Sequence, residues 1–439
     1  MKTQIIDQVR HVCTLGGLQS VLAIDRAIPV LHAGPGCGQK LWGAIGLQNG
    51  GQGSGYAGGH TVPCTNATER DVVFGAVDKL EEVIENTFKV IDADFFAVLT
   101  GCTSDIVGDD VENVVSKFQK QGKAIVWAET GGFKGSNFLG HEMVLDAIFG
   151  QYLTPAAEKN RGQVNIWAVV PFQDPFWTGV YADLAELLRA IGLKPNVIFG
   201  PGGGIRAVDR IPAAEFNLLV SPWVGLKAVK QLEERFGTPF LHYPVLPIGP
   251  TETGKFLRAV AEFADLDRTV VEAFIAEREN HYYHFIERAA EVLLETRFLP
   301  RHFTTVTDST YGLALAKFLV SDLGLIPDRL YVVDGIPEHL QKEVREFFTD
   351  LGEGLGAEVS FTPDGGAVQN ELRTTKFRSR PLILASAWER TLAKELNGFL
   401  LSVSMPVSDR LIFDRSYVGY TGGLRLVEDI YSSILADFQ

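Results

Sequence analysis

Residues 94–130 read DFFAVLTGCTSDIVGDDVENVVSKFQKQGKAIVWAET, in which two apolar runs flank a polar stretch. The runs at 95–99 and 124–128 have the length and hydrophobicity of buried strands, and residues 109–122 have the spacing of an amphipathic helix that ends at Gly122. A strand, a helix and a second strand in this order predict a βαβ unit. The stretch therefore predicts a parallel sheet that is covered by helices on both faces.

The same alternation of strand-like and helix-like segments continues through the rest of the chain. A polar segment with a proline, YLTPAAEKNRGQ at 152–163, separates the first series from a second, and a third series begins near residue 302. We therefore predict an α/β protein with three Rossmann-like, doubly wound parallel-sheet domains. The predicted limits are 1–155 for an N-terminal α/β domain that carries the cysteines, 156–299 for a middle domain, and 300–439 for a C-terminal domain that ends in a helix.

Composition excludes several classes of protein. The 439 residues are 46% hydrophobic and carry 40 basic against 54 acidic side chains, a formal net charge of −14. No uncharged apolar stretch approaches the ~20 residues of a membrane span, and the first residues lack the pattern of a signal peptide. We therefore expect a cytoplasmic protein without a membrane partner. The acidic balance without a dense basic cluster also argues against nucleic acid as a partner.

The cysteines are confined to the first quarter of the chain, at Cys13, Cys37, Cys64 and Cys102. Random placement would confine all four to the first 102 residues with a probability of roughly 0.3%. Disulfides are disfavoured in a reducing cytoplasm. Spacing alone leaves two explanations for this clustering. The cysteines are either four small buried hydrophobic residues or ligands of a metal site.

The surroundings of three cysteines favour the metal site. Cys37 lies in HAGPGCGQ and Cys102 in TGCTSD, each directly after a strand-like run, and Cys13 precedes Gly16 and Gly17. Ligands of parallel sheets bind beyond the carboxyl ends of the strands. Glycine beside a thiol leaves bare backbone N–H groups that can face the sulfides of an iron–sulfur cluster.

Other polar motifs have simpler explanations. The glycine-rich segment 201–206 is interpreted as a flexible loop rather than a phosphate cradle, and His281 with His284 as a solvated pair rather than metal ligands. Helix capping or helix-end electrostatics accounts for a further set of acids and hydroxyls without catalysis. That set is Asp105, Asp109, Asp110, Asp308, Ser309, Thr310 and Ser386. His32 and His60 flank a glycine-rich segment and could line a site, but a single histidine does not indicate a metal or catalytic site.

Four motifs, taken together, resemble the nitrogenase component 1 family and its nitrogenase-like reductases. These motifs are CTLGG at 13–17, HAGPGCG at 32–38, TERDVVFGA at 68–76 and TGCTSDIVGDDV at 100–111, and MPVSDRLIFDRSYVGYTGG at 405–423 resembles the closing segment of the family. The resemblance implies an α/β heterodimer or α2β2 heterotetramer. It also implies an eight-iron P-cluster (8Fe–7S) at each α–β interface, with three cysteine ligands from each side.

By position in the resemblance, Cys13, Cys37 and Cys102 are the cluster ligands on this chain, and Cys64 is a packing residue. Three thiolates cannot saturate a four-iron or eight-iron cluster, so an α-type partner would supply the rest. No cysteine follows Cys102 and no histidine follows His339, whereas a catalytic α subunit holds its cofactor with later residues of both kinds. The chain thus resembles the β-type, electron-relay subunit and carries no catalytic residue of its own. Phe74 matches the position at which the ATP-dependent [4Fe–4S] iron protein docks.

Two departures from the nitrogenase pattern bear on the reaction. The loop TGGFKGS at 130–136 has Gly132 where nitrogenase β subunits usually have a serine, and the loop around Cys37 is richer in glycine. These departures favour a nitrogenase-like methylthio-alkane reductase, which cleaves C–S bonds reductively at an iron–sulfur cofactor in the α-type partner. Two alternatives remain, the β subunit of an alternative nitrogenase that reduces N2 and a scaffold for assembly of a nitrogenase-type cofactor.

Overall fold

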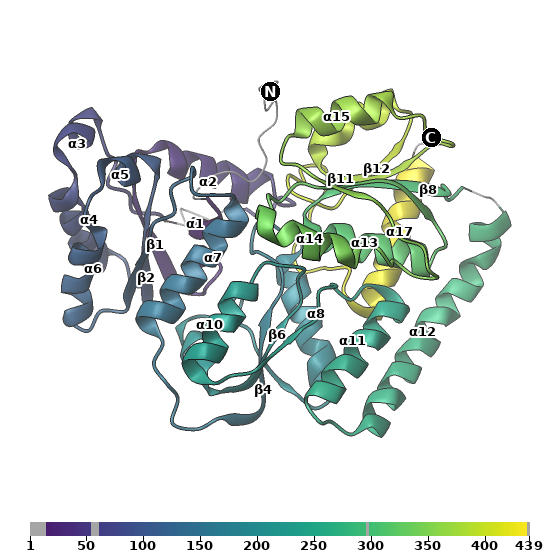
Figure 1. Ribbon diagram of the computed structural model, residues 1–439, viewed down its shortest axis with the longest axis horizontal. Helices are drawn as coiled ribbons and strands as arrows, with labels where there is room; N and C mark the ends of the chain where they lie inside the picture. The colour runs from purple at the N-terminus through teal and green to yellow at the C-terminus, as the bar shows by residue number, and fades with distance from the viewer. Residues whose placement is uncertain (1–14, 54–60, 296–297, 437–439) are drawn as a thin grey trace.

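The computed structural model describes residues 15–53, 61–295 and 298–436 (Figure 1). Cys13 and His60 lie outside the described residues. The described residues form three separate sheets in which all strand pairs are parallel. The predicted α/β class with three Rossmann-like units is therefore confirmed. Each of the predicted ranges 1–155, 156–299 and 300–439 encloses one sheet, while the limits themselves remain predictions.

The first sheet has the strand order β1-β2-β3, formed by β1 (Ala27–His32), β2 (Phe95–Thr100) and β3 (Ile125–Ala128). All residues of β2 are buried, because helices cover both faces of the sheet. One face packs against α1 (Leu15–Leu22) and α7 (Asn137–Ala147), and the other against α4 (Val77–Val90) and α6 (Val111–Lys120). Three more helices are α2 (Gly36–Leu47), α3 (Glu69–Phe74) and α5 (Cys102–Val107).

Helices α1 and α7 approach each other at Gly16. A Cβ atom at Gly16 would lie 1.9 Å from the backbone oxygen of Asn137, so only glycine fits there. One turn later, Ser20 Oγ lies 2.7 Å from His141 Nδ1. This contact fixes α1, the helix that directly follows the first predicted cysteine ligand, against the core of the first sheet.

The second sheet has the order β5-β4-β6-β7 and occupies the bottom of Figure 1. Its strands are β4 (Asn160–Trp167), β5 (Lys194–Asn196), β6 (Ala214–Leu219) and β7 (Phe240–His242). The helices of this part are α8 (Trp177–Ala190), α9 (Ile205–Asp209), α10 (Leu226–Phe236), α11 (Gly249–Phe263) and α12 (Arg268–Glu295). A π-helical turn η1 (Ile148–Tyr152) precedes the sheet, and a 3₁₀ turn η2 (Ile211–Ala213) precedes β6.

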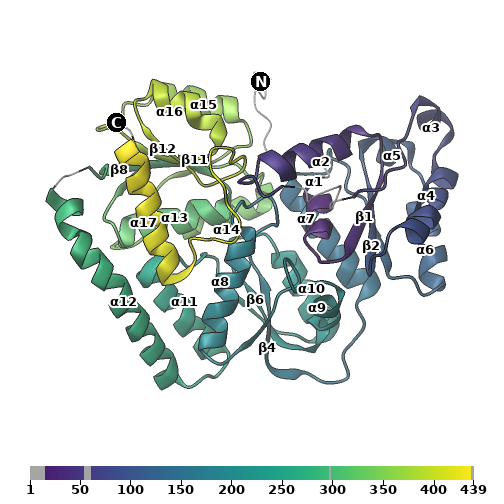
Figure 2. The ribbon, with the colours of Figure 1, turned by 180° about the vertical axis from the view of Figure 1, so that it is seen from behind.

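The third sheet has the order β10-β9-β8-β11-β12. Its strands are β8 (His302–Thr307), β9 (Ile326–Val332), β10 (Val359–Phe361), β11 (Leu382–Ala385) and β12 (Phe399–Ser402). The helical segments are α13 (Ser309–Ser321), α14 (Glu338–Phe347), α15 (Gly365–Thr374), η3 (Ala387–Glu389), α16 (Arg390–Glu395) and α17 (Gly419–Leu435). Helix α17 packs against α8, α11 and α12, and so joins the third part to the second (Figure 2).

The second and third sheets close against each other at their carboxyl edges. Strand order reverses beside β4 in one sheet and beside β8 in the other, and such switch points commonly form ligand crevices. A cavity of about 10 Å³ lies between them, and its lining includes Gln173, Asp174, Asp308 and Thr310. All four of these side chains are buried.

Burial has a strong effect on the carboxyl groups at this junction. It raises the pKa of Asp308 to about 7, and it also raises the pKa values of Asp174 and Asp334. Asp308 additionally caps α13, because its side chain accepts a hydrogen bond from the Tyr311 N–H at 3.0 Å. The capping role expected for Asp308 is thus confirmed.

We expect the substitution Asp308→Asn to stabilise the protein above neutral pH. A free aspartate has a pKa near 3.9, so between about pH 4 and pH 7 the folded state holds a proton that the unfolded chain has released. The free energy of unfolding of the wild type should therefore fall as pH rises through this window. Asparagine retains the cap without ionising. It should raise the free energy of unfolding at pH 8 by on the order of 3 kcal/mol, measured by urea denaturation at pH 5 and pH 8.

The control is Asp110→Asn, the same change at an exposed helix cap. It should leave the pH dependence of the urea midpoint as in the wild type. An equal flattening in both variants would show that the effect does not come from the buried carboxyl group.

No helix in the described part of the chain combines the length and the apolar character that crossing a bilayer requires.

Candidate functional site

Cys37 and Cys102 lie at the same edge of the first sheet. Strands β1 and β2 pair in parallel with His32 opposite Thr100, so the loops that follow them start side by side. Cys37 lies in the first turn of α2, and Cys102 is the first residue of α5. Cys102 is exposed, Cys37 is partly exposed, and neither forms a disulfide. The structure therefore brings these two predicted ligands to one end of the sheet.

Gly101 brings the two cysteine loops into contact. Its N–H donates to the backbone oxygen of His32 at 3.0 Å. A Cβ atom at Gly101 would lie 2.5 Å from Ala33 Cβ and 3.9 Å from Cys37 Sγ. The sulfur of Cys37 is thus close to the residue directly before Cys102. Any larger residue at Gly101 would push the loops apart.

The loop after β3 supplies a hydrogen-bond donor to the second thiol. The Gly132 N–H donates to Cys102 Sγ at 3.2 Å. Lys134 in the same loop forms an ion pair with the buried carboxylate of Asp105 at 3.0 Å, which ties the loop to α5. Backbone N–H groups that face ligand sulfurs are characteristic of iron–sulfur sites and tune their potentials.

The backbone on either side of Cys37 is uncrowded among the described residues. A Cβ atom placed at Gly36 or at Gly38 would meet no atom within 4 Å. Two soft thiols, a donor N–H and bare backbone at an exposed edge suit an iron–sulfur group that is held partly by another chain. These residues would supply only part of the ligands of such a group. Among the residues that the structure describes, no three His, Cys, Asp or Glu side chains cluster as a metal site.

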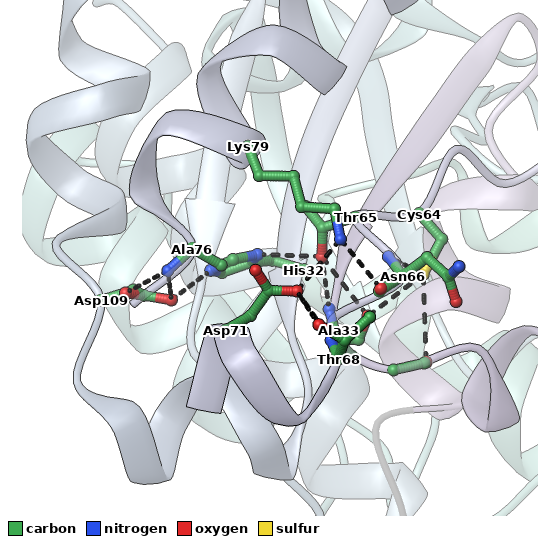
Figure 3. Close-up of polar contacts among 11 residues, drawn as sticks. His32, Ala33, Cys64, Thr65, Asn66, Thr68, Asp71, Ala76, Lys79 and Asp109 are labelled. Atoms are coloured by element: carbon green, nitrogen blue, oxygen red, sulfur yellow. Dashed lines mark hydrogen bonds and ion pairs between the residues drawn. The ribbon is translucent and has the colours of Figure 1, made fainter. Parts of the chain in front are cut away.

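Cys64 lies in a different setting, in contact with the loop that follows β1 (Figure 3). Its Sγ donates to the backbone oxygen of Ala33 at 3.3 Å and accepts the N–H of Asn66 at 3.3 Å. Burial raises the pKa of the Cys64 thiol, which disfavours the thiolate that metals require. This geometry fits the packing role predicted for Cys64.

Both ring nitrogens of His32 take part in a buried hydrogen-bond network and are not directed at a ligand. Its Nε2 lies 2.9 Å from Asp109 Oδ2 and its Nδ1 lies 3.1 Å from Thr65 Oγ1 (Figure 3). Burial lowers the pKa of His32. Asp109 also accepts the N–H of Ala76 at 3.1 Å. Helix-end placement therefore explains Asp110, which caps α6, but it is wrong as a full account of Asp105 and Asp109, because both make long-range contacts.

An exposed apolar patch lies next to the cysteine edge. Phe74 is 81% exposed at the end of α3, next to Val73, and α3 packs against α5, which carries the exposed Ile106. Helix α3 is held by a capping box in which Asp71 Oδ2 accepts the Thr68 N–H at 2.7 Å and pairs with Lys79 at 3.0 Å (Figure 3). These contacts lower the pKa of Asp71 to about 2. Phe74 is thus placed where a partner can reach it.

The remaining candidates do not join this site. In the 201–206 loop, a Cβ atom at Gly203 would lie 2.4 Å from the backbone oxygen of Ile198, so its glycine serves close packing. His281 and His284 both contact the ring of Phe285 on α12. Ser386 caps η3 as expected, since it accepts the N–H of Trp388.

Sequence reasoning missed the roles of Gly101 and of the Gly132 N–H. A glycine directly before a cysteine was a visible signal for Gly101. The donor role of Gly132 was not visible, because it joins residues 30 positions apart on two loops.

Comparison with known proteins agrees with this geometry. A family model described as nitrogenase component 1 type oxidoreductase matches residues 13–435. The nitrogenase molybdenum-iron protein beta chain of Clostridium pasteurianum is 24% identical, over 96% of this chain and 91% of its own length. One of the subunits of the light-independent protochlorophyllide reductase of Angiopteris evecta is 22% identical, over 82% of this chain and 71% of its own length.

A solved structure, nitrogenase Cp1 at pH 6.5, has the same fold. It superimposes with a TM-score of 0.83, covering 100% of this chain and 95% of that chain at 21% identity. The family match spans nearly the whole chain, and it includes all four cysteines. This chain therefore belongs to the nitrogenase component 1 type oxidoreductase family, as a β-type subunit of a nitrogenase-like oxidoreductase.

Proposed function

We propose that this chain is the electron-relay subunit of a nitrogenase-like reductase that cleaves C–S bonds of methylthio-alkanes. The observation that carries the proposal is the common edge of Cys37 and Cys102, with the Gly132 N–H directed at Cys102 Sγ. Together with Cys13, these thiols would hold half of a P-cluster-type 8Fe–7S group, and an α-type subunit would hold the other half. When bound, that group would supply one-electron transfer at low potential.

The chain's own residues would position this group and the partners on either side of it. Gly101 sets the spacing of the two cysteine loops, and the Gly132 N–H stabilises negative charge on one sulfur. The exposed Phe74 and Val73 would form part of the surface on which an ATP-dependent [4Fe–4S] iron protein docks. The substrate cofactor would lie in the α-type subunit of a heterodimer or α2β2 assembly.

A second candidate is the β subunit of a nitrogenase that reduces N2. Two molybdenum-iron protein beta chains, from Clostridium pasteurianum and Methanococcus maripaludis, are 24% and 25% identical to this chain over nearly its full length. Gly132 in place of the usual serine favours the C–S reductase, because glycine offers no side-chain oxygen beside Cys102.

The test is anaerobic co-purification of this chain with its partner subunit, followed by iron quantitation and reduction assays. Dimethyl sulfide and N2 are offered side by side with the iron protein and ATP. Reductive cleavage of dimethyl sulfide takes up two electrons and two protons and yields methane and methanethiol. We expect these products without ammonia. Ammonia would assign the chain to the nitrogenases, and iron without either product would favour a cofactor scaffold.

A further inference from the structure

A cavity with a volume of about 640 Å³ is lined by residues of α7, of α10 and of the start of α14. Figure 1 labels these three helices. The cavity therefore draws its walls from all three parts of the chain. Its volume falls in the range of small-molecule sites. None of its lining residues comes from the loops that carry Cys37 and Cys102, so it is separate from the candidate cluster site.

Glu142 lines this cavity and is 6% exposed. One carboxylate oxygen accepts the Gly225 N–H at the start of α10. The same carboxyl group lines the cavity. Burial raises the pKa of Glu142 to about 7. A hydrogen-bond donor that reaches this group would stabilise it, because burial disfavours an ionised carboxyl group.

The walls around Glu142 are largely apolar. Leu139, Met143, Leu226 and Leu340 line the cavity, and so does the buried indole of Trp223. The Trp223 Nε1–H donates to Asp334 at 3.2 Å, which fixes the ring. An apolar body of several carbon atoms can therefore pack beside the carboxyl group.

The charge of Lys227 acts on Glu142 through space and lowers its pKa in part, but Lys227 makes its ion pair elsewhere. Lys227 forms an ion pair with Asp146, while Lys230, Glu234 and His339 lie at the exposed rim. A cationic group of a ligand would therefore meet Glu142 without displacing a resident cation. Because Glu142 is buried, only a slim group can reach it, which favours a small molecule over a folded partner.

We propose that this cavity binds a small organic cation, with a protonated amine on Glu142 and an apolar body against Trp223, Leu226 and Met143. The site is independent of the proposed reductase function. Its occupant is identified only by this chemistry, a primary ammonium group on an apolar chain.

The probe is n-hexylamine, titrated into the anaerobically purified complex at pH 8 by isothermal titration calorimetry. At this pH Glu142 is ionised and the amine is protonated. We expect hexylamine to bind at least ten-fold more tightly than 1-hexanol, which has the same body without charge. Hexanoate should not bind. Glu142→Gln should reduce the affinity for hexylamine to that for hexanol.

Two further variants make the result decisive. Glu252→Gln changes a carboxyl group of equal burial outside the cavity and should leave binding unchanged. Leu340→Trp narrows the cavity while keeping Glu142, and should weaken hexylamine binding even if Glu142→Gln does not fold. Equal binding of hexylamine and hexanol, tighter binding of hexanoate, or unchanged hexylamine binding in Leu340→Trp would each overturn the proposal.

Discussion

Replacing Cys102 by alanine is expected to remove most of the cluster iron from the purified complex and to abolish reductase turnover. The exposed Sγ of Cys102 is the sulfur to which the Gly132 N–H donates, at the edge that faces the proposed partner. Alanine cannot replace a thiolate ligand, and a cluster that lacks one ligand at an exposed edge is open to solvent. Cys13→Ala and Cys37→Ala should have the same effect. The measurements are iron per complex and the rate of product formation.

The control for this series is Cys64→Ala. Its thiol makes hydrogen bonds to the backbone of Ala33 and Asn66 and lies in a setting that disfavours the thiolate. Iron content and turnover should remain near the wild-type values. A similar loss of iron at all four positions would contradict the assignment of three ligands and one packing residue.

Gly101→Ala is expected to lower both stability and iron content, although it leaves every cysteine in place. The new Cβ atom would lie 2.5 Å from Ala33 Cβ, at the point where the two cysteine loops meet. Overpacking of a buried contact costs about 1 to 3 kcal/mol, and here relief requires the loops to separate. We expect a lower urea midpoint and a loss of at least half of the iron.

A second substitution tests this steric explanation directly. Ala33→Gly removes the atom that the new Cβ meets, so the double variant Gly101→Ala with Ala33→Gly should recover iron. Gly43→Ala on α2 meets no atom within 4 Å and should leave iron unchanged. If the double variant holds no more iron than Gly101→Ala alone, the contact with Ala33 is not the cause.

Much of this fold could be predicted from local sequence, because parallel strands buried on both faces leave a clear pattern. The run FFAVLT became β2 with every residue buried, and Gly122 lies two residues after the end of α6 with a positive φ, as expected near a helix end. The capping roles of Asp110, Asp308 and Ser386 were also predictable, since a cap bonds to residues two or three positions away.

Contacts between distant segments could not be predicted in this way. Asp109 reaches His32 across 77 positions, and Glu142 reaches Gly225 across 83. Nothing in the local pattern distinguishes these acids from ordinary carboxylates at or within helices. Their roles depend on how strands and helices pack against one another. A short stretch of sequence carries no information about that packing. The cavity around Glu142 was invisible for the same reason.

The closed junction between the second and third sheets limits how this subunit can be redesigned. Its cavity of about 10 Å³ has room for about one water molecule, and Asp174 and Asp308 line it at the switch point where open α/β sheets commonly bind ligands. A ligand site at that junction would require the second and third sheets to move apart first. In an engineered electron-transfer protein, new partners should therefore be attached at the edge that carries Cys37 and Cys102. The junction between the second and third sheets should be left unchanged, because it holds the two parts together.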